Sequence, residues 1–345
     1  MRLIKPSYEI IEQGPGLQGI YDIIERCGKI SYKSEPKGGE VAKRFVEART
    51  KERHGAVLEF GTVYLKIPVQ DPLSFNGEEY NWEAVEASEF YDWNQYSRVR
   101  MAPDSNSAEY YITTNYRVLV ENNRLDDLKY LCEPTEYHEK RYAVKFITDI
   151  GLGRDFLRHR VMSMVQESTR YVNYAKEKFG EELTFVIPPW IEKGVLKEND
   201  HVYKNGDTWY RGKCGWQEEV LPASYCGKRI DIWLSALGAC ETAYLNLVND
   251  WDEMEGPWQP QQARGVLPLA TKTEFVLCGF TDAWIHFFRL RSDIAATGKA
   301  HPMSIQLANP LRDEFIERKY ITKENLEHDL FEPFDVAISD RVLKD

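Results

Sequence analysis

The residues best suited to chemistry lie together in one segment, Arg158–Tyr171, with the sequence Arg-His-Arg-Val-Met-Ser-Met-Val-Gln-Glu-Ser-Thr-Arg-Tyr. These fourteen residues include three arginines, a histidine, two serines and a tyrosine. Guanidinium groups offer charged, paired donors to phosphate oxygens, and hydroxyl groups add neutral donors. The segment therefore predicts a binding site for a doubly charged phosphate monoester.

The arginine cluster stands out because the whole chain is acidic, with a formal net charge of −11 and a pI near 5.3. Nucleic-acid binding normally needs a basic footprint, so we expect no nucleic-acid partner. No apolar run reaches the roughly eighteen residues of a membrane-spanning helix. The first residues, Met1–Pro6, lack the apolar core of a secretory signal. We therefore expect a cytoplasmic protein that binds a small anionic ligand.

The cysteines predict neither a disulfide framework nor a zinc site. None of the six forms a Cys-x-x-Cys pair, and none has an activating partner nearby in the sequence. We expect no metal and interpret them as buried, reduced thiols. They are Cys27, Cys132, Cys214, Cys226, Cys240 and Cys278.

Apolar spacing predicts the elements that must position the arginine segment. Helices are expected at 39–54, 82–93, 125–132, 228–250, 281–293 and 310–319, and strands at 63–68, 142–148, 184–187 and 273–279, with an extended run at 110–120. A glycine turn at Gly151–Gly153 is expected to lead into a helix that carries Arg158 and Arg160. Leu157, Val161 and Met164 would continue its apolar stripe.

The order of these elements predicts one domain over residues 1–345. Its polar stretches, at about 70–107 and about 191–217, are interpreted as insertions, because no convincing linker separates the rest. The expected helix at 228–250 is about six turns long, which favours packing on a neighbouring helix or subunit.

The spacing Arg-His-Arg, seven residues, then Ser168 resembles the signature of the flavin-dependent thymidylate synthases. Chance would produce such a pattern on the order of once per thousand chains of this length. The chain is most similar to the longer members, which carry extra segments before the signature. The resemblance implies an α/β (α+β) fold like that of the thymidylate synthase complementing proteins, with a mixed sheet flanked by helices, one of them long.

The resemblance also implies a dUMP site. Its residues would be Arg158, Gln166, Ser168 and Arg170 of the signature, Arg264 of the segment Ala263–Pro268, and Arg291 of Phe287–Arg291. Gln166 replaces a carboxylate that is common in the family. Arg291 and Ser168 would be the catalytic residues, with Arg291 holding a fixed positive charge against the uracil carbonyls. Ser168 would donate a hydrogen bond rather than act as a nucleophile, because no general base is identifiable beside it.

For FAD, the resemblance implies two further groups of residues. His54 and Glu59 match the family's His-x-x-x-x-Glu segment, and Arg158, His159, Arg160 and Val161 belong to the signature. His286 and Leu290, further along the chain, are added to these two groups. Phe280 and Asp282 stand where many members carry Asn-x-Arg, so His286 is the substitute candidate for the adenosine contacts.

The implied reaction is the reductive methylation of dUMP to dTMP, with FAD as cofactor and with NADPH and methylenetetrahydrofolate as co-substrates. The family works as a homotetramer with sites at subunit interfaces. Two other interpretations stay open. One is a flavoprotein that modifies another pyrimidine nucleotide, for example by hydroxymethylation; the other is a non-catalytic nucleotide- or RNA-binding protein. The mass of the product would separate the first from the synthase, and a colourless protein without FAD would favour the second.

Overall fold

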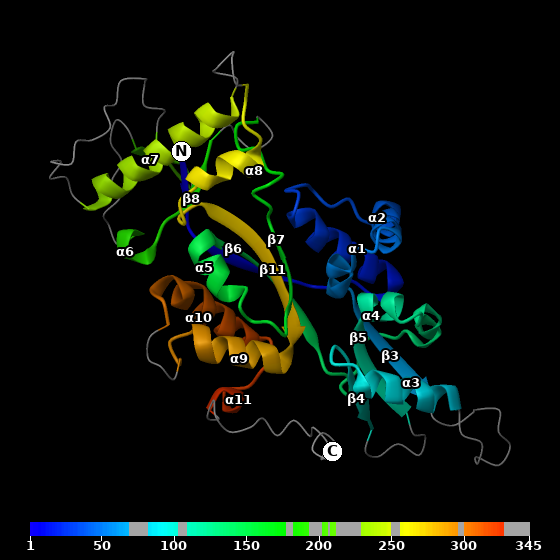
Figure 1. The fold of residues 1–345 in the computed structure, drawn as a ribbon. Coiled ribbons are helices and arrows are strands. Elements are labelled where there is room, and N and C mark those ends of the chain that lie inside the picture. Colours follow the sequence, from blue (N-terminus) through cyan, green and yellow to red (C-terminus); the bar gives the residue numbers. More distant parts are fainter. Residues whose placement is uncertain are drawn as a thin grey trace, which may run out of the picture. The chain divides into compact units, whose positions relative to one another are not determined.

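The computed structural model describes residues 1–68, 82–102, 109–176, 182–192, 202–205, 208–211, 229–249, 256–295 and 300–327. The chain divides into two compact units, Met1–Phe280 and Thr281–Asp345 (Figure 1). The expected single domain over 1–345 stays a prediction, and both expected insertions lie partly outside the described residues. No helix within the described ranges is long and apolar enough to cross a membrane.

Part of the signature lies in a four-stranded antiparallel sheet of the first unit, in the order β2-β6-β11-β7. Figure 1 labels β6, β11 and β7 of this sheet. Its strands are β2 (Ser7–Ile11), β6 (Arg141–Asp149), β11 (Lys272–Phe280) and β7 (Ser163–Gln166). Eight of the nine residues of β11 are buried, as expected for an apolar strand with a neighbour on each side. Phe146 and Phe275 face each other in register, with their ring centroids 5.4 Å apart. This sheet confirms the expected strands at 142–148 and 273–279.

Helix α5 (Ile150–Phe156) connects β6 to the signature. Asp149 begins the helix, because its side chain accepts a hydrogen bond from the Leu152 N–H at 2.6 Å. The expected glycine turn is therefore wrong: Gly151 and Gly153 lie inside a helix. Gly153 allows the helix to approach β11 closely, since an added Cβ would come within 3.2 Å of the Thr273 methyl group.

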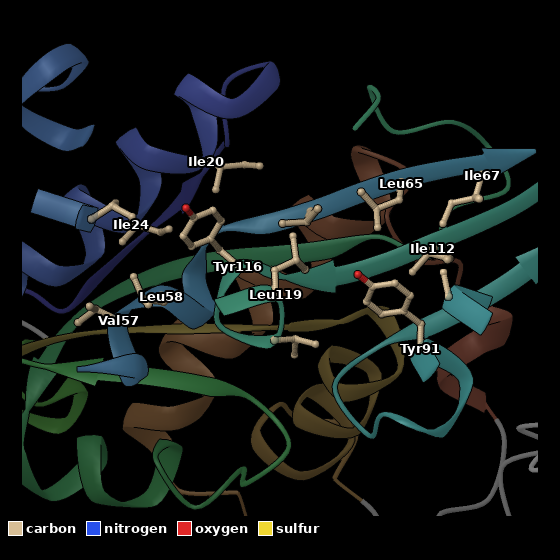
Figure 2. Close-up of a cluster of buried hydrophobic side chains, with 14 of the residues drawn as sticks. Ile20, Ile24, Val57, Leu58, Leu65, Ile67, Tyr91, Ile112, Tyr116 and Leu119 are labelled. Atoms are coloured by element: carbon tan, nitrogen blue, oxygen red, sulfur yellow. The ribbon is translucent and has the colours of Figure 1, made fainter. Parts of the chain in front are cut away.

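A second sheet has the order β3-β5-β4 and consists of β3 (Thr62–Pro68), β5 (Glu109–Asn115) and β4 (Arg98–Met101). Its core is shared with α1 (Gly16–Ile30) and α3 (Trp82–Trp93). Figure 2 shows Ile20 and Ile24 of α1 beside Tyr116, with Leu65 and Ile112 of the sheet further along the same cluster. The cluster explains why α1 packs on this sheet.

The third sheet is mixed, in the order β8-β1-β10-β9. Strand β1 (Arg2–Ile4) is parallel to β8 (Thr184–Val186) and antiparallel to β10 (Thr208–Arg211), which pairs with β9 (Val202–Asn205). The long helix α7 (Arg229–Val248) confirms the helix expected at 228–250. Leu234, Leu237 and Tyr244 of α7 share a core with Leu3 and Phe185. The α/β fold class is confirmed, although the strands form three sheets rather than one.

Shorter helices connect the strands and longer helices of the first unit. They are α2 (Gly39–Lys51), the 3₁₀ helix η1 (Gly55–Phe60), α4 (Tyr116–Glu121), the 3₁₀ helix η2 (Leu125–Tyr130), α6 (Pro189–Glu192), α8 (Pro260–Ala263) and the 3₁₀ helix η4 (Arg264–Val266). The run expected to be extended over 110–120 becomes helical at Tyr116. The Asn115 side chain causes this change by accepting a hydrogen bond from the Val118 N–H.

The second unit contains α9 (Thr281–Arg291), α10 (Pro302–Glu317) and α11 (Glu324–Glu327). Trp284, Phe287 and Phe288 of α9 form an aromatic cluster with Phe315 of α10. Helix α10 begins eight residues earlier than Pro310, the expected start, because His301 accepts from the Met303 N–H and Pro302 occupies the first helical position.

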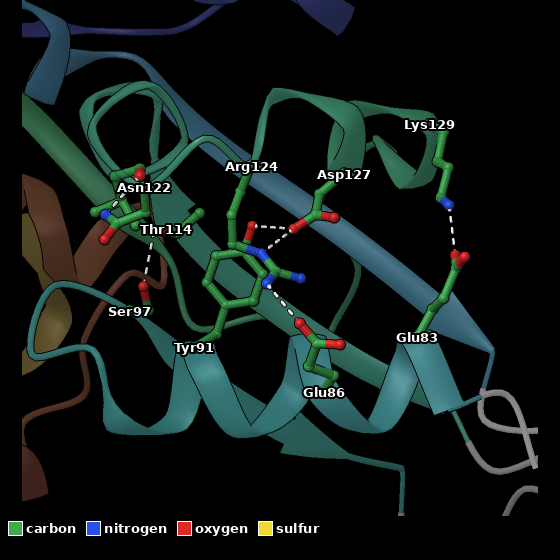
Figure 3. Close-up of polar contacts among 10 residues, drawn as sticks. Glu83, Glu86, Tyr91, Ser97, Thr114, Asn122, Arg124, Asp127 and Lys129 are labelled. Atoms are coloured by element: carbon green, nitrogen blue, oxygen red, sulfur yellow. Dashed lines mark hydrogen bonds and ion pairs between the residues drawn. The ribbon is translucent and has the colours of Figure 1, made fainter.

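A buried polar contact joins α3 to η2. Figure 3 shows Tyr91 and Arg124 pointing toward Asp127. The Tyr91 hydroxyl donates to Asp127 Oδ2 at 2.8 Å, and Arg124 Nε donates to the same oxygen at 2.6 Å. Burial and the hydrogen bond to Asp127 raise the pKa of Tyr91, so this hydroxyl stays a donor. A second ion pair, Lys129 with Glu83 at 2.7 Å, links the same two elements.

This contact predicts which of two substitutions lowers the free energy of unfolding more. Tyr91→Phe leaves Asp127 bound to Arg124, so we expect the free energy of unfolding to fall by about 1 kcal/mol. Asp127→Ala leaves a buried hydroxyl and a guanidinium without their shared acceptor, so we expect a fall of roughly 2–3 kcal/mol. Urea unfolding followed by tryptophan fluorescence measures both. Equal losses in the two variants would contradict the proposed geometry.

Candidate functional site

The signature forms a turn and a strand rather than the expected helix. Helix α5 ends at Phe156, residues 157–162 form turns and a bend, and β7 follows at Ser163. Strand β7 pairs with β11 from Ser163, opposite Cys278, to Gln166, opposite Phe275. The predicted helical stripe is wrong: Val161 is 76% exposed and Met164 is 36% exposed. Pairing with β11 therefore overrides the helical spacing of the apolar residues.

Two exposed arginines lie before β7. The Arg158 side chain is 75% exposed and lies 3.4 Å from an oxygen of Asp155. Arg160 is also exposed, whereas His159 between them is buried. The His159 carbonyl accepts a hydrogen bond from the Met162 N–H at 3.1 Å, which turns the chain into β7. This end of the strand thus presents two guanidinium groups and the apolar Val161 at the surface.

The other end of β7 carries the remaining signature residues. Gln166 Nε2 donates to Thr273 Oγ1 of β11 at 3.0 Å. The Ser168 hydroxyl accepts a hydrogen bond from the Arg170 N–H at 3.3 Å, which closes a local turn. Arg170 is exposed, and its guanidinium carbon lies 5.7 Å from the centroid of the Tyr171 ring. The Arg170 charge therefore lies at the surface, at the opposite end of the strand from Arg158.

A buried ion network anchors this second end. Lys272 Nζ lies 2.9 Å from an oxygen of Glu167, and the two side chains are only 7% and 2% exposed. Lys272 also pairs with Glu274, which lies 2.8 Å from Lys145. Tyr174 completes the group, because its hydroxyl donates to Glu167 at 3.4 Å. Sequence reasoning missed this network. Its only local sign is Lys272 and Glu274 two residues apart, on the same face of a strand.

Arg141 joins the signature to the segment expected to bind flavin. Its Nη1 donates to the Glu59 carbonyl at 3.1 Å and to Thr62 Oγ1 at 3.3 Å. Its Nη2 donates to Ser163 Oγ of β7 at 3.2 Å. The structure therefore brings the end of η1 and the start of β7 together through one guanidinium. Sequence reasoning did not identify Arg141.

The two residues predicted in that upstream segment have different surroundings. His54 is exposed at the N-terminal end of η1, between α2 and β3, which confirms the expected helix-to-strand junction. Glu59, at the other end of η1, pairs with Arg117 of α4. Its carboxylate is thus already balanced by one positive charge in the folded chain.

Arg264 is exposed where α8 ends and η4 begins. Its neighbour Ala263 is fully buried in the core that also contains Val172 and Tyr174, shortly after the signature. The structure therefore anchors the Arg264 segment and the end of the signature in one core. The role of Arg264 in the site stays a prediction.

Three predicted residues lie on α9, in the second unit. The Arg291 carbonyl accepts a hydrogen bond from Ser304 Oγ at 2.7 Å, and its side chain is partly buried. His286 and Leu290 are also partly buried. Burial, followed by the charges of Arg289 and Arg291, lowers the pKa of His286. The roles of Arg291, His286 and Leu290 in the site stay predictions.

Comparison with known families gives one match. The family described as thymidylate synthase complementing protein matches residues 135–315, just over half of the 345-residue chain. This range includes β6, the signature, the Arg264 segment and α9. No curated protein matches the chain.

Solved structures resemble the chain only distantly. The UMP/dUMP methylase PolB from Streptomyces cacaoi, bound with 5-Br dUMP, is 12% identical, with 92% of this chain and 93% of that chain covered and a TM-score of 0.38. The same methylase bound with 5-Br UMP is 14% identical, with 91% of each chain covered and a TM-score of 0.36. Thymidylate synthase X from Helicobacter pylori, with FAD and dUMP, is 12% identical, with 94% and 100% covered and a TM-score of 0.35.

The ion network predicts a particular loss of stability in acid. Burial raises the pKa of Glu274, but Lys272 and Lys145 outweigh it and hold this pKa at about 2, below the ordinary 4.5. A depressed folded-state pKa contributes stability above the unfolded pKa, and this contribution disappears as the pH falls from about 4.5 toward 2. We expect Glu274→Gln to flatten the fall in the free energy of unfolding across that window.

The control for this measurement is Glu9→Gln, which removes an exposed partner of Arg26. Its profile of unfolding free energy against pH is expected to follow that of the unsubstituted protein. A Glu274→Gln profile as steep as the control profile would show that Glu274 does not carry the proposed charge interaction.

Proposed function

Because the chain belongs to the thymidylate synthase complementing protein family, we propose that it is a flavin-dependent thymidylate synthase. It would convert dUMP to dTMP by reductive methylation, with FAD as cofactor and with NADPH and methylenetetrahydrofolate as co-substrates. One observation carries the proposal. The signature strand is held on β11 by pairing from Ser163 to Gln166, whereas Arg158 and Arg160 before it and Arg170 after it are exposed.

Exposed arginines suit both ligands. The dUMP phosphate carries about −1.5 to −2 charges at neutral pH, and guanidinium groups bind such oxygens with paired, charged hydrogen bonds. Arg170, Ser168, Gln166 and Arg264 would hold the nucleotide. The chain itself is acidic, so these positive charges are local and would select a small anion over a polyanion.

The other end of β7 fits the flavin. Arg158 and Arg160 can meet the pyrophosphate of FAD, and the exposed Val161 offers an apolar contact beside them. By resemblance, His54, Glu59, His159, His286 and Leu290 are also assigned to the flavin. When bound, FAD supplies the hydride of the reaction, while the chain supplies position and charge.

Three of the four described cysteines favour a mechanism without a thiol nucleophile. Burial raises the pKa of Cys27, Cys132 and Cys278, which keeps these thiols protonated and unreactive. Cys214 and Cys226 lie outside the described residues. Arg291 would instead hold a permanent positive charge against the uracil carbonyls and stabilise negative charge that develops on the ring. Ser168 would act as a hydrogen-bond donor to the nucleotide.

The separation of the arginines favours a site shared between subunits. Arg158 precedes β7 and Arg170 follows it, and the four residues of the strand span roughly 13 Å at about 3.3 Å each. A homotetramer, the assembly that the family resemblance implies, would bring the flavin end of one subunit to the nucleotide end of another. In this arrangement, both arginines are exposed in the single chain and still contact the ligands of one shared site.

A second candidate function is favoured by Gln166. This amide stands where a carboxylate is common in the family, and the structure uses its Nε2 to bind Thr273. A neutral group there changes what the pocket accepts, so another pyrimidine nucleotide, modified for example by hydroxymethylation, is the alternative substrate. A non-catalytic nucleotide- or RNA-binding protein is a further alternative that would need no flavin.

The proposed reaction predicts a flavin absorbance that responds to substrates. Purified protein is expected to be yellow, to be bleached by NADPH faster in the presence of dUMP, and to release dTMP once methylenetetrahydrofolate is added. Stopped-flow absorbance followed by mass spectrometry of the nucleotide measures each step. A product of another mass, or a product from dCMP alone, would favour the second candidate. Absence of bound flavin would contradict both proposed enzymatic functions.

The shared site predicts complementation between two inactive variants. If Arg158 and Arg170 come from different subunits, co-expressed Arg158→Ala and Arg170→Ala chains form some sites with both arginines intact. Random assortment would restore about a quarter of the activity. The matched control pairs Arg158→Ala with the double variant, in which no site regains Arg158. Activity no higher in the first mixture than in the control would contradict a shared site.

A further inference from the structure

The 3₁₀ helix η1 carries the two upstream residues that resemblance assigns to the flavin, with His54 just before it and Glu59 near its end. Its inner side is held in the core by three buried apolar residues, Val57, Leu58 and Phe60. Its polar side is held by two arginines from other elements, Arg141 of β6 and Arg117 of α4. Neither arginine belongs to the signature or to the His-x-x-x-x-Glu segment.

Arg141 connects three elements to its own strand. Its Nη1 donates to the Glu59 carbonyl and to Thr62 Oγ1 at the start of β3, and its Nη2 donates to Ser163 Oγ at the start of β7. Every hydrogen-bond acceptor that Arg141 meets in the described part of the chain is neutral. Arg141 therefore acts here through the shape of its planar fork, which reaches acceptors on different elements at once, rather than through an ion pair.

Arg117 holds the side chain of the same glutamate. Its Nη1 pairs with Glu59 Oε1, and its Nε pairs with Glu121 of α4 at 2.7 Å. Arg117 also packs against the start of η1, because a Cβ added at Gly55 would come within 2.8 Å of Arg117 Nε. The backbone of Glu59 is thus fixed from β6 and its carboxylate from α4.

The β3-β5-β4 sheet places Arg117. Strand β3 follows η1 directly and pairs with β5 along its length. Helix α4 begins where β5 ends, with the Asn115 side chain as its cap, and the Tyr116 N–H donates to the Gly61 carbonyl at 2.8 Å. This sheet lies outside residues 135–315, which match the family, so the match assigns it no role.

The signature residues proposed for the flavin lie on the other side of the Arg141 contact. Ser163 begins β7, and the exposed Arg158 and Arg160 lie just before it. A ligand that binds both η1 and these arginines needs the two segments at one fixed spacing. An error in that spacing would weaken binding even with every contacting residue intact.

We propose that Arg141 and Arg117 are positioning residues for the flavin. They fix η1 against the start of β7, so that the residues at its two ends keep a constant distance from Arg158 and Arg160. The β3-β5-β4 sheet then serves to support this part of the site. The inference rests on the proposed function, because it takes FAD as the ligand of η1.

Three variants test the role of the fork. Arg141→Met removes it and is expected to weaken FAD binding about tenfold. Arg141→Lys keeps the charge on a single point donor that cannot span η1 and β7, so its loss is expected to lie within about threefold of the methionine variant. Arg117→Met removes a partly exposed ion pair and is expected to weaken binding about twofold to fivefold. Quenching of flavin fluorescence by protein freed of FAD measures each affinity.

Arg124→Met is the matched control. Arg124 also connects two elements, η2 through Asp127 and α3 through Glu86, and it does not contact η1 in the ranges that the structure describes. This variant is expected to lower the free energy of unfolding at least as much as Arg141→Met, and to keep FAD affinity within about twofold. In all variants saturated with FAD, calorimetric dUMP affinity is expected to stay within about threefold, because dUMP is proposed to bind at the other end of β7.

Two binding results would overturn the inference. If Arg141→Lys binds FAD as tightly as the unsubstituted protein, charge rather than the fork matters, and Arg141 is not a positioning residue. If Arg124→Met weakens FAD binding as much as Arg141→Met, the effect is a general loss of stability.

Hydrogen–deuterium exchange without ligand separates this inference from the proposed function. Arg141→Met is expected to speed exchange at residues 57–61 and 163–166. Unchanged exchange in both segments would show that Arg141 does not couple η1 to β7, whatever the FAD affinity. An unsubstituted protein that binds no FAD would instead refute the proposed function, and the positioning role for flavin with it.

Discussion

The structure of the site depends on one buried ion pair, between Lys272 of β11 and Glu167 at the end of β7. Burying two charges is unfavourable unless each is well matched. Here Glu274 gives Lys272 a second carboxylate, and Tyr174 gives Glu167 a hydroxyl donor. The pair therefore specifies where β7 ends on the sheet. Its geometry fixes the next residues, Ser168 to Arg170, at the surface.

The two ends of β7 are held by different means, and this difference matters for function. Arg141 attaches the start of the strand to η1, and so to the segment expected to meet the flavin. The ion network and the Ser31 carbonyl hold the other end, where the nucleotide is proposed to bind. Because interior groups carry the structural contacts, the exposed arginines remain available to anions. The same chemical type, arginine, thus has a structural role at position 141 and a proposed binding role at positions 158 and 170.

Local spacing predicted much of the fold but not the conformation of the signature. Helices α2, α7 and α9 and strands β3, β6 and β11 appear close to their expected bounds, because their apolar periodicity agrees with their packing. Helix α3 also has its expected bounds, in a stretch that is only weakly periodic. The prediction of a helix in the signature was wrong because Leu157, Val161 and Met164 have helical spacing. Strand β7 is instead specified by pairing with a strand more than a hundred residues later. Lys272 and Glu167, 105 positions apart, could not be paired without that register. The short strands β1 and β2 carry too few residues for a periodic pattern. The family resemblance, rather than the fold, assigns the binding roles of the site residues.

The central claim is that a pyrimidine mononucleotide binds at the surface turn that the Lys272–Glu167 pair holds in place. Hydrogen–deuterium exchange of the whole chain, with and without dUMP, tests this claim without requiring turnover. We expect dUMP to slow exchange at the amides of residues 166–171 and at the neighbouring loop 31–34, with α3 and the β3-β5-β4 sheet unchanged. Unchanged exchange at residues 166–171 and 31–34, together with slowed exchange elsewhere in the chain, would contradict the account.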